Sequence, residues 1–191
     1  MDLCLPYRSR RNYIHSADIF QSLMDVARAR FSGDTYVESL VLRRQATHQI
    51  RLSFEATPNP IGAFALRAGK ERVRGWIAET EADVCARVPY DESRAAAAVV
   101  GGPGFAQFVE PVAGYTAFEQ LIILLKVTSG EPDGWLGQAN LRGPLLDSSP
   151  VAVRLRHRAM GRFFAFEILQ HGQVIGDAYA ASYDHAALHE V

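Results

Sequence analysis

The sequence has almost no excess charge of either sign. Its 20 Lys and Arg residues are nearly balanced by 21 Asp and Glu residues, so the formal net charge of the 191-residue chain is −1. Proteins that bind nucleic acid or anionic membranes through electrostatic attraction need a clear excess of positive charge. We therefore expect neither a nucleic-acid partner nor a membrane partner.

Cysteine is scarce as well. The two cysteines, Cys4 and Cys85, lie far apart in the sequence and have neither metal-ligand nor redox spacing. The sequence also shows no nucleotide-binding loop, no Ser/His/Asp arrangement and no cluster with metal-ligand spacing. We expect free thiols in a reducing cytoplasm, although the sequence also allows a disulfide, and we expect no metal and no cofactor.

Long hydrophobic runs are missing too. The longest strongly apolar helical run, residues 118–127, is far shorter than the roughly 20 residues of a membrane span. The N-terminus has no hydrophobic segment of secretory length. A composition of 48% hydrophobic and 21% charged residues is typical of a globular protein with one domain or two small fused units. A soluble cytoplasmic protein is the expectation.

Two amphipathic segments predict helices. The first covers residues 17–31, with Ser16 placed to cap its N-terminus and Asp18 in its first turn. The second covers residues 115–127 and ends at Ser129-Gly130-Glu131. In the first helix the apolar residues follow helical spacing on one face: Ile19, Phe20, Leu23, Met24 and Ala27.

Strand patterns follow each predicted helix. The first helix precedes strands at 36–44, 48–54, 63–67 and 73–84, and the second precedes strands at 135–145, 151–158, 163–169 and 174–183. Hairpin turns are predicted at 68–70 and 170–172. Residues 85–113 read as a connection, within which Gly101-Gly-Pro-Gly104 is expected to be irregular.

The two halves share the order of their predicted elements and a short sequence similarity in their helices. The first helix contains Phe20-Gln-Ser-Leu23, and the second contains Phe118-Glu-Gln-Leu121. A helix followed by about four antiparallel strands, present twice, indicates a duplication. The pattern resembles the hotdog superfamily, in which a curved antiparallel sheet wraps around a central helix.

This resemblance implies an α+β double hotdog with two central helices, each wrapped by its own curved antiparallel sheet. The first unit would cover residues 1–90, a connecting segment 91–113, and the second unit 114–191. A fused pair of units needs no partner to complete its sheet, so a monomer or a homodimer is expected.

One segment carries the main chemical resemblance. Residues 111–120, with Gly114 five positions before Glu119, resemble the helix start of β-hydroxyacyl thioester dehydratases. The resemblance implies that Glu119 is a catalytic acid near a helix N-terminus that polarises the thioester carbonyl. Glu119 also stands among apolar residues, and partial burial favours proton transfer by a carboxyl group near neutral pH. The alternative is a glutamate on the solvent-facing side of the helix.

The first helix has Gln21 at the position that matches Glu119, so only one half carries the acid. His15 stands just before this helix. The division resembles polyketide synthase dehydratase domains, with histidine in the first hotdog and acid in the second, and implies that His15 removes the α-proton. Those domains place their histidine about eight residues before the helix, near Tyr7 in this numbering, so His15 is alternatively a capping or surface residue.

A second resemblance concerns thioester hydrolysis. The segment from Tyr13 to Arg28 is similar to the helix motif of acyl-CoA thioesterases, with His15-Ser16 in place of the usual asparagines. It implies that Glu119 or Asp18 activates water while backbone amides at 15–16 or 114–115 bind the oxyanion.

Tyr13 and Tyr115, one beside each helix start, are candidate donors to the thioester oxygen, or else ordinary half-buried aromatic residues. Arg8, Arg10 and Arg11 are candidates for binding a pantetheine phosphate or an acidic carrier protein, or else belong to a solvated tail.

The resemblances together predict an enzyme that acts on acyl thioesters of coenzyme A or an acyl carrier protein. Dehydration of a 3-hydroxyacyl group in fatty-acid, polyketide or secondary metabolism is the first hypothesis. Hydrolysis or acyl transfer is the second, and a non-catalytic protein that binds an acyl ligand is the third.

Overall fold

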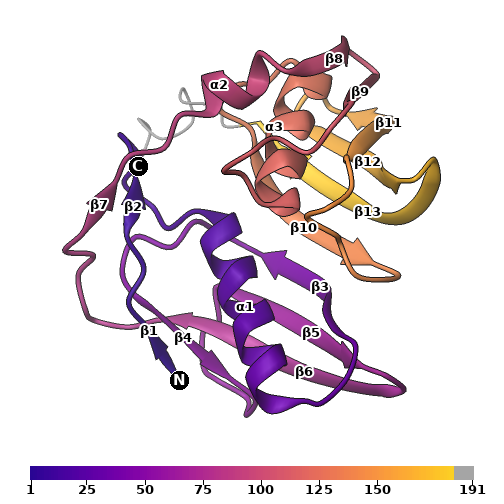
Figure 1. Cartoon of the computed structure of the whole chain (residues 1–191). Helices are drawn as coiled ribbons and strands as arrows, with labels where there is room; N and C mark the ends of the chain where they lie inside the picture. Colours follow the sequence, from indigo (N-terminus) through magenta and orange to yellow (C-terminus); the bar gives the residue numbers. More distant parts are fainter. Residues whose placement is uncertain (183–191) are drawn as a thin grey trace. The chain divides into compact units, whose positions relative to one another are not determined.

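The computed structural model of the protein describes residues 1–182. These residues form two compact units, which Figure 1 shows. The N-terminal unit comprises Met1–Ser93 and Gln138–Leu145, and the C-terminal unit comprises Arg94–Gly137 and residues 146–182. Each unit combines one long helix with antiparallel strands, which is consistent with the hotdog fold.

The long helix of the N-terminal unit is α1 (Ser16–Arg30), which packs on β3 (Thr35–Leu42) and β5 (Gly62–Ala68). Its buried residues repeat every three or four positions, as the sequence predicts: Ala17, Ile19, Phe20, Leu23 and Ala27. Met24, which was expected on the same face, is only half-buried. The other face of α1 is polar and meets solvent.

The sheet of the N-terminal unit is antiparallel, in the order β1-β4-β6-β5-β3. The strands not yet given are β1 (Asp2–Leu3), β4 (Ile50–Ser53) and β6 (Glu71–Glu79). The β5–β6 hairpin turns at Gly69 and Lys70, as predicted. On the other edge of β3, Gln138–Asn140 pair with Ser39–Val41. A separate parallel pair joins β2 (Tyr7–Arg8) to β7 (Arg87–Val88).

The long helix of the C-terminal unit is α3 (Ala117–Ser129), which is buried on nearly every side. It packs mainly on β11 (Ala152–Ala159) and β9 (Phe105–Phe108), with further contacts to β8 (Val99–Gly102) and β12 (Phe163–Gln170). Its sequence is almost continuously apolar from Leu121 to Leu125, which suits burial on all faces. Gly130 ends the helix in the left-handed conformation at φ 74°.

The remaining elements are α2 (Glu92–Ala96), β10 (Trp135–Leu141) and β13 (Gln173–Ala181). Along the chain α1 is followed by β3–β6 and α3 by β10–β13, so the predicted element order is confirmed. The pairing differs between the units. In the C-terminal unit β11, β12 and β13 form a meander, whereas in the N-terminal unit β6 lies between β4 and β5.

The prediction that Gly101–Gly104 is irregular is wrong for the first two residues, whereas Pro103 and Gly104 form a turn. Gly101 and Gly102 belong to β8, which forms a hairpin with β9. Gly101 has φ 108°, and a Cβ there would lie 2.4 Å from the Phe105 carbonyl oxygen, so the strand tolerates only glycine at this point. Residues 91–113, interpreted as a connection, contain a short helix and two strands, which are α2, β8 and β9.

No helix within residues 1–182 combines the length and the apolar character that crossing a membrane requires.

The packing of α3 generates a prediction about stability. Leu121 is 0% exposed, so Leu121→Ala should lower the free energy of unfolding by about 2–5 kcal/mol through lost burial and a residual cavity. Val109 is 65% exposed, and Val109→Ala should change the free energy of unfolding by less than about 0.5 kcal/mol. Urea unfolding followed by circular dichroism measures both, and equal effects would contradict the buried position of α3.

Candidate functional site

The start of α1 is built around His15. This residue, not the predicted Ser16, is the N-cap: Ser16 is the first helical residue. The Nδ1 atom of His15 accepts a hydrogen bond from the backbone N–H of Ala17 at 3.4 Å, and its carbonyl oxygen accepts one from Asp18 N–H at 3.0 Å. A histidine serves here because an imidazole nitrogen, like a carboxylate or hydroxyl oxygen, can satisfy an amide of the first turn.

The other ring nitrogen of His15 faces a carboxylate. Its Nε2 lies 3.8 Å from Oε1 of Glu92, the first residue of α2. Arg11 holds the same oxygen at 2.7 Å, and the ring of Tyr90 lies 5.4 Å from the imidazole between centroids. His15 is only 3% exposed. The imidazole is therefore enclosed between a backbone amide, a carboxylate and an aromatic ring.

Burial lowers the pKa of His15 below its ordinary value, and the positive charges of Arg8 and Arg11 act in the same direction. Glu92 opposes them by favouring the charged imidazole. Near neutral pH His15 is therefore uncharged. Because Nδ1 accepts the Ala17 N–H, the proton of the neutral ring sits on Nε2 and points towards Glu92.

Asp18 is held by an arginine. Its two carboxylate oxygens accept hydrogen bonds from Arg8 Nε at 2.7 Å and Arg8 Nη2 at 2.5 Å. The guanidinium of Arg8 also lies over the Tyr90 ring, 4.4 Å from its centroid. Arg8 and Arg11 are therefore bound within the chain rather than lying in a solvated tail, whereas Arg10 is exposed.

The other predicted residues around α1 divide into two groups. The hydroxyl of Tyr13 accepts a hydrogen bond from Arg11 Nε at 3.1 Å, which joins it to the Arg11–Glu92 pair. Gln21, more than one turn into the helix, donates from Nε2 to Asp25 at 3.0 Å. The structure thus places Tyr13, His15 and Asp18 in one cluster and Gln21 outside its hydrogen bonds.

The start of α3 is closed by a capping box. Thr116 is the N-cap, and its hydroxyl accepts a hydrogen bond from Glu119 N–H at 3.2 Å. The Oε2 atom of Glu119 in turn accepts bonds from Thr116 N–H at 2.7 Å and from the Thr116 hydroxyl at 3.0 Å. Glu119 is 7% exposed and lies in the first turn. Its buried carboxylate satisfies the helix start, so it is not a solvent-facing glutamate.

A second carboxylate reaches the same helix start. Asp147, in the loop after β10, accepts the Ala117 N–H through Oδ1 at 2.6 Å. The Tyr115 N–H donates to the Val112 carbonyl at 3.1 Å, and Gly114 supplies the positive φ of 86° that turns the chain into the helix. The amides of residues 115 and 117 are thus bound within the chain in this structure.

Gln120 is a buried polar residue that the sequence reading did not single out. It is 0% exposed. Its Oε1 accepts the Val112 N–H at 3.3 Å, and its Nε2 donates to the Tyr115 carbonyl at 3.1 Å. Gln120 therefore fixes the loop 112–115 against the helix that follows it.

Glu92 and Tyr90 were missed because they lie in the stretch interpreted as a connection. The Asp-Glu-Ser run at 91–93 could have been recognised as a helix start, with Asp91 accepting the Ser93 N–H at 3.0 Å. No sequence signal indicates that this short helix begins beside His15, because the two segments are far apart along the chain.

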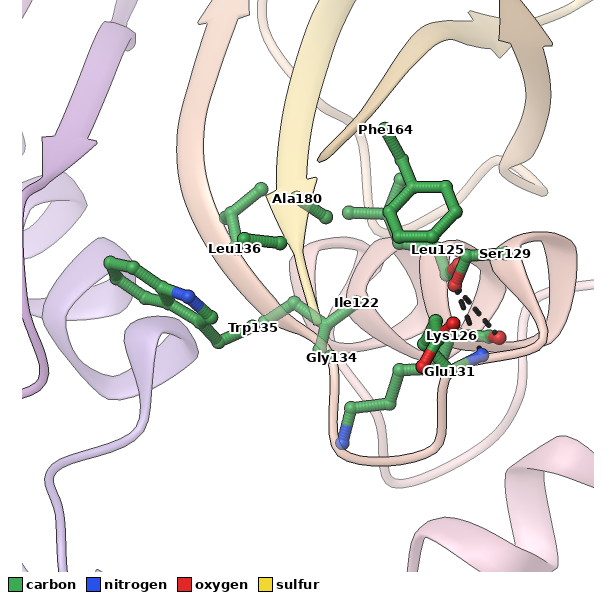
Figure 2. A pocket seen from close by; sticks show the side chains of 11 residues that line it. Ile122, Leu125, Lys126, Ser129, Glu131, Gly134, Trp135, Leu136, Phe164 and Ala180 are labelled. Carbon is green, nitrogen blue, oxygen red and sulfur yellow. Dashed lines mark hydrogen bonds between the residues drawn. The ribbon is translucent and has the colours of Figure 1, made fainter. Parts of the chain in front are cut away.

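A small, mainly apolar pocket lies at the opposite end of α3 from Glu119. Figure 2 shows Ile122, Leu125 and Phe164 around it, with Lys126, Ser129 and Glu131 as its polar members. The Ser129 hydroxyl donates to the Lys126 carbonyl and accepts from Glu131 N–H, which ties the polar rim together. None of the residues proposed for catalysis lines this pocket.

Within residues 1–182 no three His, Cys, Asp or Glu side chains are grouped so that they could hold a metal ion. Cys4 and Cys85 are both free and exposed. The disulfide that the sequence allowed is not formed.

Comparison with known proteins gives structural likeness only. No family model matches the chain, and no curated protein matches it. The acyl-ACP thioesterase from Bacteroides thetaiotaomicron is 8% identical with a TM-score of 0.47, over 95% of this chain and 96% of that one. The 12:0-ACP thioesterase from Umbellularia californica is 8% identical with a TM-score of 0.46, over 95% of both chains.

The dehydratase domain of a mycocerosic acid synthase-like polyketide synthase is 9% identical with a TM-score of 0.46, over 90% of this chain and 83% of that one. The similar structures thus include polyketide synthase dehydratase domains and acyl-ACP thioesterases, both of which are hotdog proteins. At this level of similarity the likeness says nothing about the reaction or the residues of this chain.

The buried imidazole generates a prediction about pH. The unfolded chain binds a proton at His15 with a pKa near 6.5, and the folded chain binds it only at lower pH. The unfolded state therefore holds more protons in this window, so the stability due to neutral His15 is full above about pH 6.5. It is lost as the pH falls through the lowered folded-state pKa, by up to about 1.4 kcal/mol per pH unit.

His15→Asn is the matched variant, because Asn also caps helices but does not titrate. Urea unfolding is measured at about six pH values between pH 7.5 and pH 5. The free energy of unfolding should fall less steeply with decreasing pH for His15→Asn than for the unchanged protein. Identical pH slopes would show that His15 has the same pKa in the folded protein as in the unfolded chain, which would contradict the lowered pKa.

Proposed function

We propose that the chain is a double hotdog protein that processes acyl thioesters, and that its reaction is dehydration of a 3-hydroxyacyl group carried by an acyl carrier protein or coenzyme A. The observation that carries this proposal is the pairing of a buried, uncharged imidazole with a carboxylate at the start of α1. His15 and Glu92 are its members, with Nε2 and Oε1 3.8 Å apart.

The pair has the arrangement that a general base requires. The lone pair of a neutral imidazole lies on the nitrogen opposite the one that faces the carboxylate, which here is Nδ1. When Nδ1 takes the α-proton of the substrate, the resulting imidazolium is stabilised by Glu92 through Nε2–H. Arg11 fixes the Glu92 carboxylate for this role. The bond that Nδ1 accepts from Ala17 N–H is long, at 3.4 Å, so a substrate can replace it at small cost.

The start of α1 also supplies the second requirement of the reaction, which is stabilisation of the negative charge that forms on the thioester oxygen. Removal of the α-proton leaves negative charge on the thioester oxygen, and the first amides of α1 together with the helix dipole stabilise that charge. The Ala17 N–H that Nδ1 releases becomes available to the oxygen. The start of α1 thus supplies both the base that removes the α-proton, His15, and the amides that stabilise the negative charge left on the thioester oxygen.

Glu119 is proposed to complete the reaction as the acid. The C–O bond of the 3-hydroxyl group breaks, Glu119 gives that oxygen a proton, and water leaves as the 2,3 double bond forms. The Thr116 bonds to Oε2 hold the carboxyl group in place.

A second candidate function is non-catalytic binding of an acyl ligand. It is favoured by the observation that the side chains of His15 and Glu119 already cap the helices on which they stand. Thioester hydrolysis has less support from the geometry. Asp18, one of the two acids proposed to activate water, is held in a two-bond ion pair by Arg8.

The proposal predicts the products of a direct assay. Incubation with a 3-hydroxybutyryl thioester of N-acetylcysteamine should yield the 2-enoyl thioester, which chromatography with mass detection identifies. His15→Asn and Glu119→Gln should each lower the rate by at least about 100-fold, because each removes a proton-transfer group. Glu92→Gln should lower kcat with little change in KM, since Glu92 only positions the base.

Two exposed residues serve as matched controls. His48→Asn in the N-terminal unit and Glu110→Gln in the C-terminal unit should leave the rate unchanged, because both side chains are exposed. Release of free thiol instead of the enoyl product would support hydrolysis. If neither product forms and the ligand only raises the melting temperature, the chain is an acyl-binding protein.

A further inference from the structure

We propose that Ser149 is a second reactive group, a nucleophile that accepts an acyl group from activated esters and thioesters with His171 as its base. The two side chains lie in the C-terminal unit. Ser149 Oγ and His171 Nε2 are 2.9 Å apart, the distance of a good hydrogen bond. A hydroxyl bonded to an imidazole nitrogen is the geometry in which a histidine activates a serine.

His171 lies in a tight hairpin turn. His171 and Gly172 form the two-residue turn between β12 and β13, with φ 52° and 72°. Such turns strongly favour Asn, Asp or Gly at the first position, because both residues need positive φ. Histidine is among the residues that tolerate positive φ, and this histidine also bonds to Ser149.

Ser149 is held firmly beside this turn. The side chain of Gln170, the residue before His171, donates to the Ser149 carbonyl at 2.9 Å and to the Leu146 carbonyl at 2.8 Å, and accepts the Leu146 N–H at 3.0 Å. Ser149 is 4% exposed and Gln170 is 3% exposed, whereas His171 is exposed. The Ser149 hydroxyl is thus held in a buried position, and the His171 imidazole bonded to it is exposed to solvent.

The same loop reaches the positive end of α3. Asp147, two residues before Ser149, accepts the Ala117 N–H at 2.6 Å.

The proposed step balances as follows. The Ser149 oxygen forms a bond to the acyl carbon while His171 Nε2 takes the hydroxyl proton. The bond from the acyl carbon to the leaving group then breaks, and the leaving thiolate or alkoxide takes the proton from the imidazolium. The products are an acyl ester on Ser149 and a free thiol or alcohol. Water can later release the acyl group as a carboxylic acid, with His171 again accepting a proton.

This site uses neither His15 nor Glu119, so it does not depend on the proposed dehydration. The substrates it takes are acyl groups on a good leaving group, with a small acyl part because Ser149 is buried. A 3-hydroxyl group is not required. A plain acetyl thioester therefore tests Ser149 without testing the dehydratase proposal.

The test is incubation of the full chain with the acetyl thioester of N-acetylcysteamine, followed by peptide mapping by mass spectrometry. Acetylation of Ser149 is the expected result. His171→Asn should slow it by about 100-fold, because it removes the base while Asn retains the positive φ that the turn needs. Thermal unfolding of the variant checks that the fold is intact.

Ser148→Ala is the matched control, since Ser148 is exposed on the same loop and is not bonded to His171. It should be acetylated at Ser149 as fast as the unchanged protein. The proposal is overturned if Ser149 stays unmodified, or if a folded His171→Asn variant is acetylated at the same rate. In either case the Ser149–His171 bond only holds the loop to the turn.

Discussion

The first backbone amides of a buried helix must find acceptors, and this requirement shapes both candidate centres of the protein. At α1 the acceptor is the His15 imidazole, and at α3 the acceptors are Thr116 and Asp147, with Glu119 returning a bond to the cap. Such caps are each worth about 1 kcal/mol. Titratable side chains thereby lie where the helix dipole is positive, which is also where a thioester carbonyl would be polarised. Stability and the proposed chemistry draw on the same atoms.

The cluster around His15 shows how the N-terminal segment contributes to this arrangement. Arg8 and Arg11 reach the start of α1 from the segment that precedes it, and each binds a carboxylate there, Asp18 or Glu92. Burial lowers the pKa of the imidazole and leaves it uncharged, with Arg8 and Arg11 acting in the same direction and Glu92 against them. An uncharged imidazole with one nitrogen directed at a carboxylate is suited to accept a proton. While the ring caps α1, its Nδ1 is occupied by the Ala17 N–H. Binding of substrate therefore has to break this hydrogen bond.

Much of the fold could be predicted because its signals are local. The apolar face of α1, the hairpin turn at Gly69 and the order of helix and strands follow from periodicity and turn residues. The exchange of neighbours in the N-terminal sheet, with β6 between β4 and β5, has no local signal. Gly101 was misread because a glycine-rich run usually marks a loop, whereas here close backbone approach requires glycine in a strand. Glu92 escaped notice because only the fold brings it to His15.

The account depends most on one physical state: a neutral His15 whose Nδ1 accepts the Ala17 N–H and whose Nε2 carries the proton. Nitrogen NMR of protein labelled with ¹⁵N-histidine, with His15 assigned through His15→Asn, measures it directly. The account predicts a neutral ring protonated at Nε2 at neutral pH, and a shift of the Nδ1 resonance when a 3-hydroxyacyl thioester analogue replaces the Ala17 bond. A charged imidazolium at neutral pH, or a neutral ring protonated at Nδ1, would contradict it.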